Sequence, residues 1–444
     1  MITLQERVHA APKPDDWQLD KLHQVFRVRR GHKNAGMKED NLLSLSYGRI
    51  IQKDIQTADG LLPENFEGYQ IVEPGNIVLR LTDLQNDKRS LRQGLVTQRG
   101  IITSAYDAVE VQRDNDPRFW FYSLLALDLA KHYYSLGGGV RQSVKFADFP
   151  NDWVYRPYLA TQRQIADFLD RETARIDLLI EKKQRLVALL GEKAASEVDL
   201  LIDGTHPRYA NAPTEYAERT NYKLKILCSR LGNGFVGPTR DILVEEDETD
   251  AIPYLQSTHV KNRKIDFQRK PYFVTRDWLN TKPKAQVRQD DLVIVQTGDC
   301  GATAIVDEEF HGSGCHAMII TRPKPDCILP RYLLQVLCSR SGREMLAAIQ
   351  TGALHPHLEV GFVKDVSIPT PLRSVQDEIL RWIENELDSL ERIQEKTQTS
   401  IDRLKEYRSA LITAAVTGQI DVQTYAKSGT PDRRLDAIQE EMGA

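Results

Sequence analysis

Two stretches of the sequence concentrate side chains that could bind a nucleic acid. Residues 21–38 contain six Lys/Arg and no acidic residue, and residues 259–288 contain nine Lys/Arg and two Asp. Lys and Arg contact phosphates, whereas Arg, Lys, Asn and Gln can hydrogen-bond base edges in the major groove. A charge run taken alone is usually a solvated face. The nucleic-acid interpretation is favoured because one basic stretch lies in each half of the chain.

The candidate contact residues lie in loops and turns of both halves. They are Arg29, Arg30, Lys33, Asn34, Gly138, Arg141 and Gln142 in the first half, and Gln256, His259, Lys261, Asn262, Gly352, His355 and His357 in the second. Gly138 is included because glycine permits close approach of another backbone. For each residue alone, a solvated polar group remains the alternative. The turns near Gly138 and Gly352 are the stronger candidates, because an internal repeat places polar residues at both.

The repeat places residues 157–165 on 371–379 and Phe168 on Trp382. A period of roughly 200 residues is too long for a solenoid. We therefore expect two globular units, each followed by the same kind of helix. Such a pseudo-two-fold chain suits a partner with two half-sites, or two copies of one partner.

Short strands followed by one helix make up each expected unit, which predicts an α+β fold rather than a βαβ arrangement. The expected strands are residues 25–28, 76–81 and 100–103 in the first unit and 291–295 and 317–320 in the second, and the expected helices are 117–134 and 330–349. The repeat matches 76–81 with 291–295, and 100–103 with 317–320.

A long amphipathic helix follows each unit, over about residues 161–199 and 374–417. Apolar residues recur every three to four positions over several heptads, which favours a coiled coil over two separate surface helices. Polar residues interrupt the seam at matching positions, Lys183 and Thr397, and would fix its register. A helix of about 40 residues is about 60 Å long, so the pair would act as a spacer between the units.

The bulk composition describes an ordinary globular chain of 444 residues, with 41% hydrophobic and 27% charged residues. We expect no membrane span, because no apolar run approaches the length of one, and the N-terminus has no signal-peptide core. Five cysteines without a C-x-x-C pair fit a reducing cytoplasm. The net charge of −4 argues against nucleic-acid binding over the whole surface, but not against local basic patches.

Motifs for catalysis by this chain are absent from the sequence. It contains no nucleotide-binding loop, no H-E-x-x-H and no G-x-S-x-G. A zinc site is an alternative for one Cys/His group, although its spacings match no standard knuckle: Cys300, His311, Cys315, His316 and Cys327. Residues 137–139 could cradle a phosphate, but a glycine stop at a helix end is the simpler interpretation.

Two segments carry a resemblance to a known family. Residues 162–177 (QRQIADFLDRETARID) with 181–186 (EKKQRL) closely resemble the central conserved helix of the specificity subunit of type I restriction–modification enzymes. Residues 404–420 (LKEYRSALITAAVTGQI) resemble the distal conserved helix of that family. The start of the second unit, residues 223–225 and 252–255, is similar in outline.

The resemblance implies two target-recognition domains, each of which reads one half of a split, asymmetric DNA sequence. The long helices would form an antiparallel coiled coil that docks two methyltransferase subunits and, through them, motor–nuclease subunits. S-adenosylmethionine, ATP and Mg would belong to those partners, so we expect no cofactor, metal or catalytic residue in this chain. The expected segments are 1–20 as an extension, 21–157 as the first domain, 158–205 as the first helical spacer, 206–371 as the second domain, 372–420 as the second helical spacer and 421–444 as a frayed tail.

Three outward positions of the first long helix, Arg171, Glu172 and Arg175, keep family-like identities that seam packing does not require. We interpret them as a docking surface for the methyltransferase, with plain i,i+4 ion pairing as the alternative. Two other classes of protein remain open. In a protein-binding scaffold, binding would lack the steep salt dependence of DNA contacts, and a standalone nuclease would cut DNA with a divalent metal.

Overall fold

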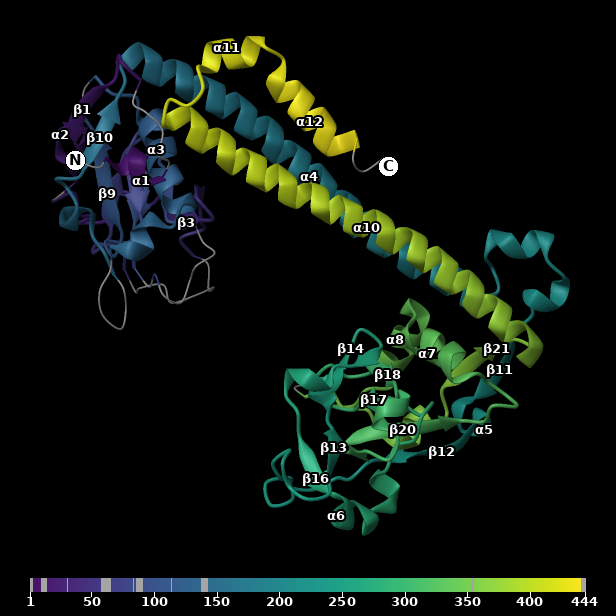
Figure 1. The fold of residues 1–444 in the computed structure, drawn as a ribbon. Coiled ribbons are helices and arrows are strands. Elements are labelled where there is room, and N and C mark those ends of the chain that lie inside the picture. The colour runs from purple at the N-terminus through teal and green to yellow at the C-terminus, as the bar shows by residue number, and fades with distance from the viewer. Residues whose placement is uncertain are drawn as a thin grey trace. The chain divides into compact units, whose positions relative to one another are not determined.

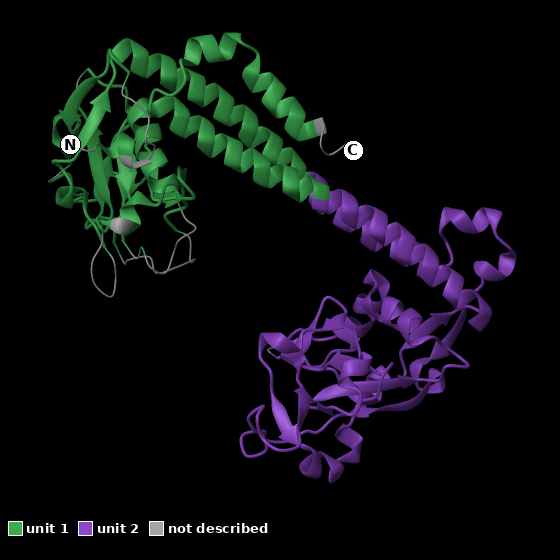
Figure 2. Ribbon diagram, in the orientation of Figure 1, with its two compact units in different colours: residues 1–185, 396–444 green, residues 186–395 purple. Residues whose placement is uncertain are grey.

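The computed structural model describes residues 3–8, 14–29, 31–56, 65–82, 84, 91–112, 114–136, 143–352 and 355–440. The chain forms two compact units: unit 1 is residues 1–185 with 396–444, and unit 2 is residues 186–395 (Figure 2). Each unit contains part of two long helices, α4 (Leu159–Asp203) and α10 (Arg373–Val416), which can be followed in Figure 1. The division therefore falls inside the long helices that the sequence predicted.

A four-stranded antiparallel sheet forms the centre of unit 1, and the same sheet recurs in unit 2. In unit 1 the strand order is β2 (Phe26–Val28), β9 (Asp107–Val111), β6 (Ile77–Leu79) and β7 (Gln93–Leu95). In unit 2 it is β12 (Cys228–Asn233), β20 (Met318–Pro323), β17 (Leu292–Val295) and β18 (Thr303–Ile305). β6 and β17 are fully buried at equivalent places, which confirms their predicted match.

The predicted match of residues 100–103 with 317–320 is wrong. β8 (Gly100–Ile102) pairs with β5 (Gln70–Val72) in a separate two-stranded sheet, whereas β20 holds the place that β9 takes in unit 1. Both runs have the composition of a buried strand, and composition does not specify the pairing partner.

One helix contacts the edge strand β7 or β18 in each unit. α3 (Pro117–Leu129) contacts β7, and α7 (Pro330–Cys338) contacts β18. The expected helix over 330–349 is instead two helices, because Ser339 has an extended backbone (ψ 166°). Its hydroxyl accepts a hydrogen bond from the Gly342 amide at 3.0 Å and so caps α8 (Arg340–Ala348).

The strand that precedes each long helix pairs with a strand from the start of the same unit. β10 (Trp153–Arg156) pairs with β1 (Gln18–Lys21), and β21 (Ser367–Thr370) pairs with β11 (Thr220–Lys223). The units differ in their additional strands. In unit 1, β3 (Leu43–Ser46) pairs with β4 (Arg49–Gln52). In unit 2, β16 (Phe273–Thr275), β13 (Ala251–Leu255) and β19 (Gly314–Cys315) form a three-stranded sheet, and β14 (Val260–Lys261) pairs with β15 (Lys264–Ile265).

The long helices pack antiparallel within each unit. In unit 1 the buried core joins Ile165 and Ile176, early in α4, with Leu404 and Leu411, late in α10. In unit 2 the core joins the end of α4, residues 198–202, with the start of α10, residues 375–383. These contacts confirm the antiparallel coiled coil, and the polar seam residues Lys183 and Thr397 are both buried in it.

Both ends of the chain are more structured than we expected. Near the N-terminus, Leu4 of α1 (Leu4–Val8) and Trp17 are buried in the core of unit 1 and β1 pairs with β10, so the described part of segment 1–20 belongs to the unit rather than to an extension. After the coiled coil, α11 (Val422–Lys427) and α12 (Thr430–Glu440) fold onto unit 1, and Leu435 is fully buried. The polar composition of both segments concealed the few apolar residues that anchor them. Among the described helices, none has the length and apolar character needed to cross a membrane.

Candidate nucleic-acid interface

A buried glutamine joins each globular domain to its long helix. Gln162 Oε1 accepts a hydrogen bond from the Asp116 amide at 2.8 Å, and its Nε2 donates to the Pro157 carbonyl. Gln376, its counterpart in the repeat, accepts from the Leu329 amide at 2.7 Å and donates to the Pro371 carbonyl. Both side chains are fully buried. The two glutamines therefore fix the junctions at which α3 meets α4 and α7 meets α10.

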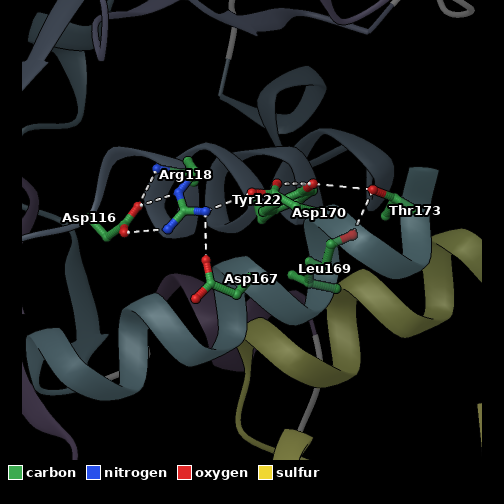
Figure 3. A network of polar contacts seen from close by, with 7 residues as sticks. All are labelled: Asp116, Arg118, Tyr122, Asp167, Leu169, Asp170 and Thr173. Atoms are coloured by element: carbon green, nitrogen blue, oxygen red, sulfur yellow. Dashed lines mark hydrogen bonds and ion pairs between the residues drawn. The ribbon is translucent and has the colours of Figure 1, made fainter. Parts of the chain in front are cut away.

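Charged contacts strengthen the junction in unit 1 (Figure 3). Arg118, on α3, forms ion pairs with Asp167 and Asp170 of α4 at 2.7 and 2.8 Å, and with Asp116 at 3.0 Å. The Tyr122 hydroxyl donates to Asp170 at 2.8 Å. The hydrogen bonds to Asp116 are the main reason that the pKa of Arg118 lies above its ordinary value. α3 is thus held on α4 by polar contacts as well as by burial.

Unit 2 repeats part of this arrangement with different residue types. Arg331 on α7 pairs with Glu384 on α10 at 2.5 Å, and the repeat places Glu384 where unit 1 has Asp170. The junction is therefore a shared feature of the two units. It does not involve the loops, so these can differ in sequence between the units.

A groove of about 640 Å³ lies beside β2 in unit 1 and is lined in part by His23, Arg27, Arg29, His32 and Glu110. Arg27 is exposed and Arg29 is half-buried. The Nε of Arg29 has no hydrogen-bond partner in the described part of the chain. Two guanidinium groups in an open groove are suited to phosphate oxygens. The sequence pointed to Arg29 but not to Arg27, although both lie in the basic stretch.

The other candidates of the first half have different outcomes. Lys33 is exposed beside its bridge to Gln70 and is available to a ligand. Asn34 is fully buried and exchanges two hydrogen bonds of 2.9 Å with the main chain of Glu39, so it is corrected from a base-reading residue to a structural one. Four candidates lie outside the described residues: Arg30, Gly138, Arg141 and Gln142.

The turn after the helices of unit 2 is joined to the loop between β17 and β18. His357 Nδ1 lies 2.9 Å from the Thr297 hydroxyl, and His355 is exposed. Gly352 has a φ of 85°, a conformation that favours glycine. The structure thus brings Gly352 and His357 together with Thr297, a residue that the sequence analysis missed.

An equivalent main-chain hydrogen bond is made by the same repeat position in both units. The Leu358 amide donates to the Gln296 carbonyl at 3.0 Å, and in unit 1 the Val144 amide donates to the Leu81 carbonyl at 2.8 Å. Leu358 and Val144 are related by the internal repeat. Each unit therefore fixes the chain that follows its turn against the end of the same central strand.

The candidates Lys261 and Asn262 lie on the β14–β15 hairpin, which contacts β18. Both are exposed, and Asn262 and Arg263 have positive φ values of 49° and 66° at the hairpin turn. Arg263 Nη1 donates to Gln335 Oε1 of α7 at 2.5 Å, which holds the turn near α7. Arg263 was not singled out from the sequence, although its position in an Asn-Arg pair between short strands was a usable signal.

The candidate His259 is corrected to a structural residue. It is fully buried; its Nδ1 accepts from the Gln256 amide at 3.0 Å, and its Nε2 lies 2.8 Å from the Lys270 carbonyl. Burial lowers its pKa below the ordinary value. Gln256 itself is half-buried where it begins this turn.

Two residues of the possible zinc site, Cys315 and His316, have environments that do not suit a metal ligand. Burial raises the pKa of Cys315 to about 12, and His316 Nδ1 lies 3.2 Å from the Tyr254 hydroxyl. Within the described ranges, no group of three or more His, Cys, Asp or Glu side chains is placed to hold a metal ion.

The proposed docking residues on α4 lie beside α11 and α12. Arg171 is exposed and stacks over the Phe168 ring at 5.7 Å. Glu172 is only 5% exposed and pairs with Arg171 at 2.9 Å, so the expectation that it faces outward is wrong. Arg175 forms an ion pair with Asp432 of α12. The C-terminal segment, which we had expected to be frayed, is therefore folded against part of the proposed docking surface.

Comparisons with known proteins agree on one family. Residues 236–403 match the family described as "Type I restriction modification DNA specificity domain". The chain is 20% identical over 329 residues to the "Type I restriction enzyme EcoBI specificity subunit" of Escherichia coli, and the alignment covers 72% of this chain and 69% of that protein.

A solved structure shows the same fold at low sequence identity. It is described as "Structural basis underlying complex assembly and conformational transition of the type I R-M system", and it aligns with a TM-score of 0.63 and 16% identity over 92% of this chain and all of that chain. The HsdS subunit from Thermoanaerobacter tengcongensis is less similar, with a TM-score of 0.49 and 14% identity over 93% of this chain and 99% of that chain.

Proposed function

We propose that this chain is a specificity subunit of a type I restriction–modification enzyme and binds a bipartite, asymmetric DNA site, because residues 236–403 match the specificity-domain family and 329 residues align with a known specificity subunit. Each globular domain, residues 21–157 and 206–371, would read one half. The observation that carries this proposal is the repeated sheet, with Val144 and Leu358, at the same position of the repeat, each hydrogen-bonded to the main chain just beyond the equivalent strand. Equivalent scaffolds with different loop residues suit two half-sites of different sequence.

Affinity would come from basic side chains on phosphates, and specificity from the loops. Arg27 and Arg29 in unit 1 and Lys261 in unit 2 are the phosphate contacts that the geometry favours. The turn that contains His355 and His357 would read base edges of the second half-site. A good bidentate contact to a base contributes about 1–3 kcal/mol of discrimination.

The coiled coil would hold the two half-site readers and dock two adenine-methyltransferase subunits, through which motor–nuclease subunits join. This chain would supply recognition and no catalytic group, with S-adenosylmethionine, ATP and Mg bound by the partners. Arg171 and Arg175 are the exposed residues of the docking surface on α4.

Methylome sequencing of cells that co-express this chain with its neighbouring methyltransferase subunit tests the proposal. The expected result is a new split motif with adenine methylated in both halves. Exchange of either domain for that of another family member should then change one half only. A stable complex that produces no new methylation, together with DNA binding that is insensitive to salt, would instead indicate a protein-binding scaffold.

A further inference from the structure

The C-terminal helix α12 lies on the coiled coil of unit 1 through a narrow apolar stripe. Leu435 is fully buried and Ile438 is half-buried in the core cluster of unit 1, and Pro431 is also buried. Most other side chains of α12 are exposed. The stripe repeats every three to four residues, as expected for a helix held by one face only.

Polar contacts connect α12 to both long helices. Asp432 forms an ion pair with Arg175 of α4, and Ser400 Oγ of α10 donates to the Ile438 carbonyl at 3.3 Å. Gly429, between α11 and α12, has a φ of 67°. A helix of eleven residues is marginal in water by itself, so α12 depends on this contact for its stability.

α11 has a contact of its own with α4 and a capped start. Its Tyr425 ring packs edge-on against Phe168 at 6.1 Å, and Asp421 caps its start by accepting a hydrogen bond from the Thr424 amide at 2.7 Å. Release of α12 about Gly429 could therefore leave α11 in place.

In unit 2, Tyr209 and Tyr216 cover Trp382, the counterpart of Phe168, but the positions equivalent to the α12 contacts are exposed. The repeat places Ser389 where unit 1 has Arg175, and Leu186 where it has Ser400. Ser389 is exposed, and Leu186 and Leu189 are 37% and 50% exposed. The face that holds an amphipathic helix in unit 1 thus presents solvent-accessible leucines in unit 2.

We propose that α12 is a displaceable helix that occupies, in unit 1, the face on which a methyltransferase subunit docks. This inference rests on the proposed function, since it takes its partner from there. A partner that contacts Arg175 must displace Asp432, whereas the equivalent positions in unit 2 are exposed. The two methyltransferase subunits therefore bind with unequal affinity, first at unit 2 and then at unit 1 with release of α12.

Two matched variants of the full chain separate this role from a general effect on the helix. Leu435→Asp removes the buried anchor of α12, and Ala437→Asp places the same residue type on its exposed side. Asp432→Arg keeps this anchor but replaces the ion pair with Arg175 by repulsion between two positive charges.

Titration of the methyltransferase subunit should show one tight and one weaker site in the parent chain. Leu435→Asp should tighten the weaker site by roughly tenfold or more, about 1.4 kcal/mol, Asp432→Arg should act in the same direction, and Ala437→Asp should match the parent.

Trypsin cleavage after Arg433 and Arg434 reports on α12 without any partner. Cleavage should be slow in the free parent chain, fast in Leu435→Asp, and fast in the parent once the second methyltransferase subunit has bound. Two equal sites that Leu435→Asp does not alter, or continued protection in the complex with two subunits, would overturn the inference. If no version binds the methyltransferase while Leu435→Asp still accelerates cleavage, the proposed docking itself is wrong, and the sequential binding falls with it.

Discussion

Gln162 and Gln376 occupy the same position in the repeat, are both fully buried, and each accept a hydrogen bond from the main-chain amide just before an equivalent helix. The two side chains therefore have the same role in α4 and α10: each joins a globular domain to the long helix that follows it through a hydrogen bond. Readout of base edges requires such fixed geometry, because hydrogen bonds weaken steeply when distance or angle is wrong.

The first prediction concerns this junction. Gln376→Leu leaves the partly buried Leu329 amide without its acceptor, and an unsatisfied buried group costs about 1–3 kcal/mol. The free energy of unfolding of unit 2 should fall by that amount in urea denaturation followed by the fluorescence of Trp278 and Trp382. Gln376→Glu keeps an acceptor for that amide but loses the donor to the Pro371 carbonyl and buries a charge, so it should not restore the stability. Equal stability of Gln376→Leu and the parent chain would contradict the assigned role.

The second prediction concerns the polar seam of the coiled coil. Burial lowers the pKa of Lys183, so the folded chain binds this proton less strongly than the unfolded chain. The charged amine therefore costs stability below its lowered native pKa, and the cost disappears as the pH rises toward 10.5. Lys183→Met should raise the melting temperature at pH 8, and its advantage should shrink by pH 10. Lys182→Met, on the exposed side, should show neither effect.

The third prediction concerns the groove in unit 1. The logarithm of the DNA-binding constant should fall linearly with the logarithm of salt concentration, with a slope of about −0.9 per contacted phosphate. Arg27→Gln together with Arg29→Gln should reduce the size of that slope by about 2 in fluorescence anisotropy titrations, for all sequences alike. Lys182→Gln together with Arg185→Gln, two exposed positions of the coiled coil, serves as the charge-matched control. A slope that stays the same in the double variant would remove the groove from the interface.

The fourth prediction concerns base readout in unit 2. His355→Ala with His357→Ala should alter or abolish the second half of the methylated motif, because both side chains lie in the turn beside Thr297. Thermal stability should change little, since His355 is exposed and His357 is only half-buried. His311→Ala, an exposed histidine in the same unit, should leave the motif intact. An unchanged motif in the double variant would assign readout to other loops.

The fifth prediction is the corresponding change in readout of the first half-site, which the repeat assigns to Arg141 and Gln142. Arg141→Ala with Gln142→Ala should change the first half of the motif while the protein stays folded, because these residues follow the helix of the first domain as His355 follows the helices of the second. Methylome sequencing of both double variants side by side checks the pair. Loss of both halves from either variant would indicate a folding defect rather than a reader.

The long helices and the repeat could be predicted from the sequence because apolar spacing persists over many turns. Shorter features depend on contacts that the local sequence does not specify. Ser339 breaks a helical pattern through one hydroxyl cap, and β8 finds its partner in β5 rather than in the main sheet. Asn34 and His259 have the residue types of base readers, yet neighbouring segments bury both. The packing of α12 on unit 1 could not be predicted from the sequence, because it depends on so few apolar side chains.

Unit 2 is one continuous segment, whereas unit 1 needs residues from both ends of the chain. A ribosome releases the N-terminal part first, so the first domain emerges before the second. The buried seam of its helix, including Ile165 and Ile176, packs with residues beyond 400, which are synthesised only after unit 2. The first domain therefore cannot complete its core until unit 2 has been synthesised, and its apolar seam stays exposed to chaperones or to aggregation during that time.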